Sequence, residues 1–140
     1  MSGYDWNTDN LLRQLHDGAL DEVLQNDASL PPFPERIAQM CLDREETRER
    51  VIRRAGIERS YGYQLFNSTR KPSRDKVIQL AFGFALDVEQ TQELLKAARQ
   101  SPLNPRIKRD TAVLYGVMHG LNIDEIQKLL ESFGMQTHGG

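Results

Sequence analysis

The stretch that decides the fold is residues 47–73, TRERVIRRAGIERSYGYQLFNSTRKPS. It has the layout of two short helices joined by a tight turn at Gly56-Ile57-Glu58, followed by a loop with a proline. Thr47 can cap the first helix, because its hydroxyl accepts hydrogen bonds from free backbone amides. Gly56 ends that helix, because glycine readily takes the left-handed conformation found after helices. The pattern predicts a helix-turn-helix unit with its second helix over 59–67.

Basic side chains concentrate in this unit. Residues 1–47 carry three Arg/Lys against ten Asp/Glu, residues 48–76 carry nine against three, and residues 77–140 carry six against seven. Phosphate responds to the charge within a Debye length, about 8 Å in the cell, and not to the chain total. The basic block therefore favours a polyanion partner, although a solvated basic helix face without a partner would have the same composition.

Helical periodicity dominates the rest of the chain, since apolar residues recur three and four positions apart and alternating β-branched runs are missing. Pro34 suits the first turn of a helix that reaches about Leu42, and Cys41 on this helix is expected to pack as a small buried hydrophobe. Further helices are predicted over 76–85, 88–98, 107–119 and 124–133, with Ser73 and Asp87 as N-terminal caps and Gly120 after a helix end. We therefore expect an all-α protein.

Three segments are predicted along the chain. Residues 1–30 have the pattern of an acidic N-terminal helical hairpin, and the prolines over 31–34 make a stiff connector. The helix-turn-helix domain occupies 31–99, and a C-terminal helical extension occupies 100–140. Six residues of that extension are candidates for a homodimer surface and equally for core: Leu114, Tyr115, Met118, Ile126, Leu129 and Leu130.

A weak internal similarity joins the last two segments. Residues 74–96 align without gaps with residues 109–131, and both begin with Arg-Asp and end on a helix with Leu-Leu. Either two related helical hairpins pack on each other, or two unrelated hairpins resemble each other by chance.

Several classes of function are not expected. The three histidines are far apart, Cys41 is the only cysteine, and glycine-rich phosphate loops and hydrolase or metalloprotease motifs are missing. We therefore predict no enzyme activity, no cofactor and no metal. No apolar run approaches the roughly 20 residues of a membrane span, and the N-terminus is polar and acidic, so we expect a cytoplasmic protein without membrane contact.

Over residues 33–98 the chain resembles the Cro/repressor class of helix-turn-helix proteins, the XRE family. The spacing from Gly56 to Pro72 fits the family pattern without a gap, and Ser60 and Leu65-Phe66-Asn67 are similar to the recognition helix of lambda-repressor-like members. The resemblance implies a lambda-repressor-like five-helix domain, here with an added N-terminal hairpin and C-terminal helix pair. It also implies sequence-specific binding of double-stranded DNA by a bacterial or phage transcriptional regulator.

The resemblance places Arg59 and Ser60 at base-reading positions and Asn67 at a phosphate-contacting one. Arg48 stands where the family often has a glutamine that braces the backbone contact, and Tyr63 can reach DNA or pack in the core. The complete set of expected DNA-binding residues is Arg48, Arg59, Ser60, Tyr63, Gln64, Asn67, Arg70, Lys71 and Arg74.

Two residues depart from the family pattern. Gly62 falls where most members place a β-branched core residue, and glycine inside a helix costs up to about 1 kcal/mol. Glu58 puts a negative charge beside the expected DNA surface. The alternative function is therefore a protein-binding module on the same scaffold, with DNA binding weak or lost and a partner held by the terminal extensions.

The charge distribution suggests a hypothesis about the N-terminal segment, namely that its acidic residues compete with DNA for the basic block. Deleting residues 1–30 should then tighten binding to duplex DNA, because the competing negative charge is removed. Fluorescence anisotropy with a labelled duplex measures the change, and equal affinity of the full and shortened chains would reject the hypothesis.

Overall fold

The computed structural model of the chain describes residues 32–67 and 71–135. These residues form seven α-helices and no strand, which confirms the predicted all-α class. None of the described helices combines the length and the apolar character needed to cross a membrane. The predicted hairpin over 1–30 lies outside the described residues. The helices are α3 (Phe33–Asp43), α4 (Arg48–Arg54), α5 (Arg59–Asn67), α6 (Arg74–Gly83), α7 (Val88–Ala97), α8 (Lys108–Met118) and α9 (Ile123–Ser132).

The N-terminal caps follow the sequence closely. Thr47, Ser73 and Asp87 each accept a hydrogen bond from a backbone N–H in the first turn of the helix that follows. Asp87 forms a reciprocal capping box with Gln90, and Asn122 caps α9 in the same way with Glu125. These contacts satisfy amides that a helix start leaves without partners, so α4, α6, α7 and α9 begin at residues that the local sequence specifies.

A common turn ends several helices. Gly56 takes a φ of 69° after α4, and the next N–H, that of Ile57, donates to the Ile52 carbonyl at 3.2 Å. Gly120 takes a φ of 64° after α8, as predicted, whereas Ala85 takes 56° after α6 without being glycine. Such turns satisfy the free carbonyl groups of a helix end, and the turn at Gly56 keeps the connection between α4 and α5 to a few residues.

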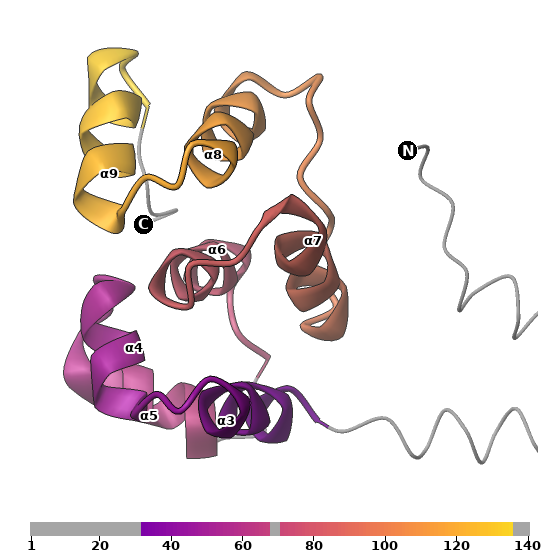
Figure 1. Ribbon diagram of the computed structural model, residues 1–140. Helices are drawn as coiled ribbons and strands as arrows, with labels where there is room; N and C mark the ends of the chain where they lie inside the picture. Colours follow the sequence, from indigo (N-terminus) through magenta and orange to yellow (C-terminus); the bar gives the residue numbers. More distant parts are fainter. Residues whose placement is uncertain (1–31, 68–70, 136–140) are drawn as a thin grey trace, which may run out of the picture. The chain divides into compact units, whose positions relative to one another are not determined.

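The helix α6 forms the centre of the described unit. All residues over 77–83 are buried, and α6 packs against α4 and α7 and also contacts α9 (Figure 1). Gly83 permits the close approach to α4, because a Cβ there would lie 2.6 Å from the Val51 carbonyl oxygen. Gln79 donates from Nε2 to the Ala55 carbonyl at 3.3 Å. The α4–α5 pair is thus attached to the core through both packing and hydrogen bonding.

The C-terminal helices α8 and α9 pack against each other and onto α7 and α6 (Figure 1). Gly116 keeps the two helices close, because a Cβ there would lie 2.7 Å from Cδ1 of Ile126. The turn at Gly56 also lies against α9, where a Cβ would lie 3.2 Å from Cγ1 of Ile123. The C-terminal extension therefore supports the turn between α4 and α5 directly.

The structure divides the six residues that the sequence left open as either core or a homodimer surface. Leu114, Ile126 and Leu130 are buried in the core with Cys41, whose burial was predicted, and Leu129 is half-buried. Only Tyr115 and Met118 of the six candidates are exposed, at 50% and 66%. Sequence periodicity could not separate these two groups, because both lie on helices that carry apolar residues on more than one side.

The two aligned segments exchange ion pairs. Arg74 at the start of α6 donates to Asp110 at the start of α8, with Nη1–Oδ1 3.0 Å and Nη2–Oδ2 2.8 Å apart. In return, Arg109 Nη2 lies 2.8 Å from Oδ1 of Asp75. The Arg-Asp pair that opens one segment therefore binds the Arg-Asp pair that opens the other, and the two helical pairs pack together.

Asp110 is the most buried member of this arrangement, with 2% of its side chain exposed. Burial alone raises the pKa of its carboxyl group. Hydrogen bonds from Arg74 and from the Asn104 N–H, together with the charges of Arg74 and Arg109, outweigh burial and hold the pKa below its ordinary value. The carboxylate is therefore the stable form in the folded protein.

We expect Asp110→Asn to lower the free energy of unfolding by about 3 kcal/mol at neutral pH, because it leaves the Arg74 guanidinium poorly paired. The folded-state pKa of Asp110 is depressed, so the stabilisation is present above the unfolded value of 3.8 and disappears as the pH falls through the folded value. Urea denaturation across that range measures both effects. Asp75→Asn is the matched control and should lose less, because Asp75 is 18% exposed. Equal losses of unfolding free energy in the two variants, or a difference between them that does not change with pH, would contradict this account.

Candidate nucleic-acid interface

The helix α5 has one buried and one outward face. Gly62, Leu65 and Phe66 are buried, and Tyr63 is half-buried. Five residues of this helix, Tyr63 among them, were expected to contact DNA. At 3.6 residues per turn, all five fall within one arc of about 140° around the helix axis. The exposed ones are Arg59, Ser60, Gln64 and Asn67.

The buried face of α5 approaches α4 very closely at Gly62. A Cβ on Gly62 would stand 2.4 Å from Cγ2 and 2.7 Å from Cγ1 of Ile52. Ile52 of the facing helix thus fills the space that a side chain at Gly62 would occupy. This close contact offsets the weak helix propensity of glycine.

Glu58 begins α5 as a cap. Its carboxylate oxygens accept hydrogen bonds from the Tyr61 N–H at 2.9 Å and the Ser60 N–H at 3.0 Å. These two backbone hydrogen bonds lower the pKa of Glu58, with the bond from Tyr61 contributing most. The negative charge beside the expected DNA surface is therefore directed at the free amides of the helix start, where an anion is favourable.

Arg48, the first residue of α4, contacts Asn67, the last residue of α5, although 19 positions separate them in the sequence. Nη1 of Arg48 lies 3.4 Å from Oδ1 of Asn67, and the guanidinium carbon lies 5.1 Å from the centre of the Phe66 ring. Both side chains are exposed. The sequence placed each of them among the expected phosphate contacts, and the folded chain joins them into one polar group at the end of α5.

The two tyrosines of α5 each lie beside a cation. The guanidinium carbon of Arg59 lies 5.8 Å from the centre of the Tyr63 ring, and Nζ of Lys76 lies 5.3 Å from the centre of the Tyr61 ring. Both tyrosines are half-buried. Tyr63 therefore helps to hold Arg59 at the outward face, whereas Tyr61 packs toward α6.

The guanidinium group of Arg74 is used in hydrogen bonds within the protein, so we no longer expect Arg74 to contact DNA. Besides its two hydrogen bonds to Asp110, it donates from Nε to the Ser101 carbonyl at 3.0 Å and from Nη2 to the Pro102 carbonyl at 2.9 Å. Its hydrogen-bonding groups are thus directed into the protein. Lys71 is exposed, and Arg70 lies outside the described residues.

The outer side of α4 adds cations that the expected set of DNA contacts did not include. Arg50 and Arg53 are exposed and have no acidic partner among the residues the structure describes, whereas Arg54 forms an ion pair with Glu46. Their placement follows from the burial of Val51 and Ile52, because those two residues turn the rest of the helix outward.

The outward face of α5 carries hydrogen-bonding side chains and meets α4 at Arg48, while Arg50 and Arg53 are further exposed cations on α4. Within residues 32–67 and 71–135, no group of His, Cys, Asp and Glu is arranged to hold a metal ion. In comparisons with protein families, with curated proteins and with solved structures, the chain finds no match. The chemistry of the surface is therefore the basis for a functional proposal.

The contact at Gly62 predicts whether a substitution there raises or lowers the free energy of unfolding. Helix propensity favours Gly62→Ala by up to about 1 kcal/mol. We expect instead a loss of about 1–3 kcal/mol, because the new methyl group overlaps the Ile52 side chain. Urea denaturation of Gly62→Ala, Ile52→Ala and the double variant measures their coupling, and Gly62→Ala should cost less once Ile52 is truncated. If Gly62→Ala were more stable than the wild type, the contact between Gly62 and Ile52 would not be what excludes a side chain at this position.

Proposed function

We propose that the chain binds double-stranded DNA sequence-specifically, as a cytoplasmic bacterial or phage transcriptional regulator without enzyme activity. In this proposal α3 to α7 are the five helices of a lambda-repressor-like domain, and α5 is the recognition helix. The observation that carries the proposal is the outward face of α5, where Arg59, Ser60, Gln64 and Asn67 are exposed and Asn67 is in contact with Arg48 of α4.

The chemistry of that face suits the major groove, which is about 12 Å wide and admits one helix. Arg59 at the start of α5 can donate two hydrogen bonds to a guanine, and Gln64 can pair with an adenine. Arg48, Arg50 and Lys71 are exposed cations that can neutralise phosphates on either side of the groove. Base reading and backbone positioning are thus assigned to different side chains.

A protein-binding module on the same scaffold is the second candidate function. It is favoured by the exposed apolar side chains of α8, Tyr115 and Met118, and by Ile107 just before the helix. An exposed apolar group of this kind is typical of a protein contact. If a second copy of the chain covers it, two copies of α5 can meet successive major grooves about 34 Å apart.

Binding to duplex DNA as a function of salt tests the proposal. The log–log slope should steepen by about 0.9 for each phosphate that the protein neutralises, so Arg48→Ala should make the slope shallower by about that amount and weaken all sequences alike. Arg59→Ala should instead relax the preference recovered from a random duplex pool, with about 1–3 kcal/mol of discrimination lost at one base pair. Arg106→Ala, in the exposed loop before α8, is the matched control. No binding even at low salt would favour the protein-binding module.

A further inference from the structure

The helices α8 and α9 repeat the local structure of α6 and α7. Both ends of α7 (Val88–Ala97) recur 35 positions later as the ends of α9 (Ile123–Ser132), and 35 is also the offset of the two aligned sequence segments. The capping boxes recur at this offset, and so do the residues with positive φ that follow the helices. Positions 35 apart in the two helical pairs can therefore be compared directly. The residues with positive φ are Ala85 and Gly120 after α6 and α8, and Arg99 and Gly134 after α7 and α9.

One face of this helical pair is buried in its first occurrence and exposed in its second. In the last turns of α6 the face is buried, and at Gly83 it lies against Val51 and Ala55 of the α4 end. At the end of α8 the three corresponding residues are all exposed. A helix thus covers this face on α6, whereas no helix of the described residues covers it on α8. The corresponding pairs are Leu80 and Tyr115, Gly83 and Met118, and Phe84 and His119.

The exposed face of α8 is mainly apolar. Ile107, just before the helix, and Tyr115 are each 50% exposed, and Met118 is 66% exposed. The rings of Tyr115 and His119 stack with their centres 4.0 Å apart, so they form one flat area. Two further exposed residues lie on the same face, because they precede Tyr115 by one and two helical turns. We call this group the α8 surface, and it consists of Ile107, Lys108, Thr111, Tyr115, Met118 and His119.

We propose that a second copy of the chain covers the α8 surface, with the two α8 helices antiparallel about a two-fold axis. In such a contact the same patch of both copies is used. Ile107 of one copy then lies beside Met118 of the other, and Thr111 lies beside Tyr115, because the two helices run in opposite directions. The proposal rests on the second candidate function, for which it names the partner and the geometry, and it does not depend on whether α5 binds DNA.

The charge of the α8 surface selects the antiparallel arrangement. Lys108 is the only Lys, Arg, Asp or Glu of this surface, and it is the first residue of the helix. Parallel helices would bring the two Lys108 side chains together, and like charges repel each other. Antiparallel helices instead place each Lys108 beside the C-terminal end of the other α8, where the helix dipole favours a cation. The α8 surface is thus complementary to a second copy of itself.

The size of the α8 surface fits a weak dimer. Its six residues present on the order of 500 Å² each time, so two copies bury about 1,000 Å² together, which is the lower limit for a specific interface. Met118 stands where α6 has Gly83, so two α8 helices cannot approach as closely as α4 approaches α6. The flexible methionine side chain can adapt to the apolar residues of the other copy. We therefore expect a dissociation constant in the micromolar range.

The experiment measures the average mass of the full chain by sedimentation equilibrium, without DNA, over a range of protein concentrations. We expect the mass to rise from that of one chain to that of two, with half of the chains paired at on the order of 10 μM. The mass of one chain at every concentration up to about 200 μM would overturn the proposal. Because no DNA is present, this result is separate from a failure of DNA binding, and because no variant is used, it does not depend on the folding of a variant.

Variants then locate the interface, with circular dichroism showing that the helices are retained. Met118→Lys should weaken pairing about tenfold, because it brings a cation into the apolar contact and close to Lys108 of the other copy. Met118→Glu should weaken pairing less, because its carboxylate lies near that same Lys108. Leu42→Lys is the matched control, since Leu42 is 72% exposed on α3, and it should pair as the wild type does. If Leu42→Lys weakens pairing as much as Met118→Lys, or if Met118→Lys and Met118→Glu have equal effects, the antiparallel contact through α8 is wrong.

Discussion

The packing of α5 on α4 at Gly62 and Ile52 is the constraint on which the candidate interface depends. Because glycine has no Cβ, the two helices approach until the Ile52 side chain fills the space where one would stand, 2.4 Å away. That contact fixes which side of α5 turns inward. Gln64 and Asn67 face outward as a geometric consequence, since the helical repeat places them roughly opposite the buried side, and Arg59 is exposed at the first residue of the helix.

The rest of the described unit keeps that pair of helices in place. The central helix α6 packs on α4 and bonds to its last carbonyl groups through Gln79, while α9 lies against the turn at Gly56. The bidentate contact between Arg74 and Asp110 joins the start of α6 to the start of α8. The C-terminal helix pair is therefore part of the support for the interface, and one of the cations of the basic block is used inside the protein.

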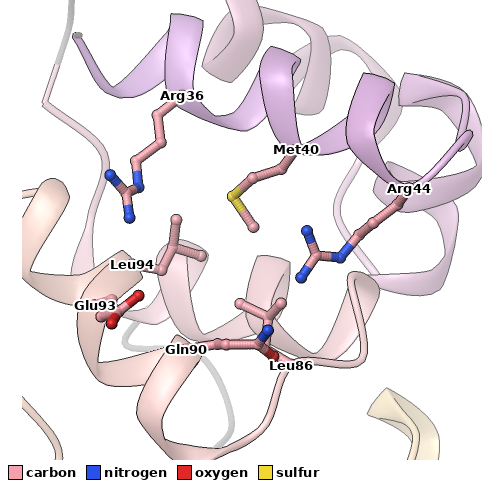
Figure 2. Close-up of a pocket in the computed structure, with 7 residues that line it drawn as sticks. All are labelled: Arg36, Met40, Arg44, Leu86, Gln90, Glu93 and Leu94. Carbon is pink, nitrogen blue, oxygen red and sulfur yellow. The ribbon is translucent and has the colours of Figure 1, made fainter.

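The helix α3 shows how one element serves two surfaces. Its buried row, Phe33, Ile37 and Cys41, packs into the core, and the neighbouring row of Arg36, Met40 and Arg44 lines a pocket toward α7. The two rows are adjacent on the helix because each repeats at intervals of four residues. Attachment through the first row holds the second row at a fixed spacing along one wall of the pocket shown in Figure 2.

The amino-acid sequence by itself determined several of the points where helices begin and end. Thr47, Ser73, Asp87 and Gly56 act through hydrogen bonds or backbone conformations that span only a few residues, so their roles can be inferred from local order alone. Only the tertiary structure decided which of the predicted site residues share a surface. It directed Arg74 to Asp110 and Glu58 to the start of α5, placed Gly62 against Ile52, and separated buried Leu114 from exposed Tyr115. These outcomes depend on how one helix lies against another, and the same periodic pattern of residues is compatible with several such arrangements.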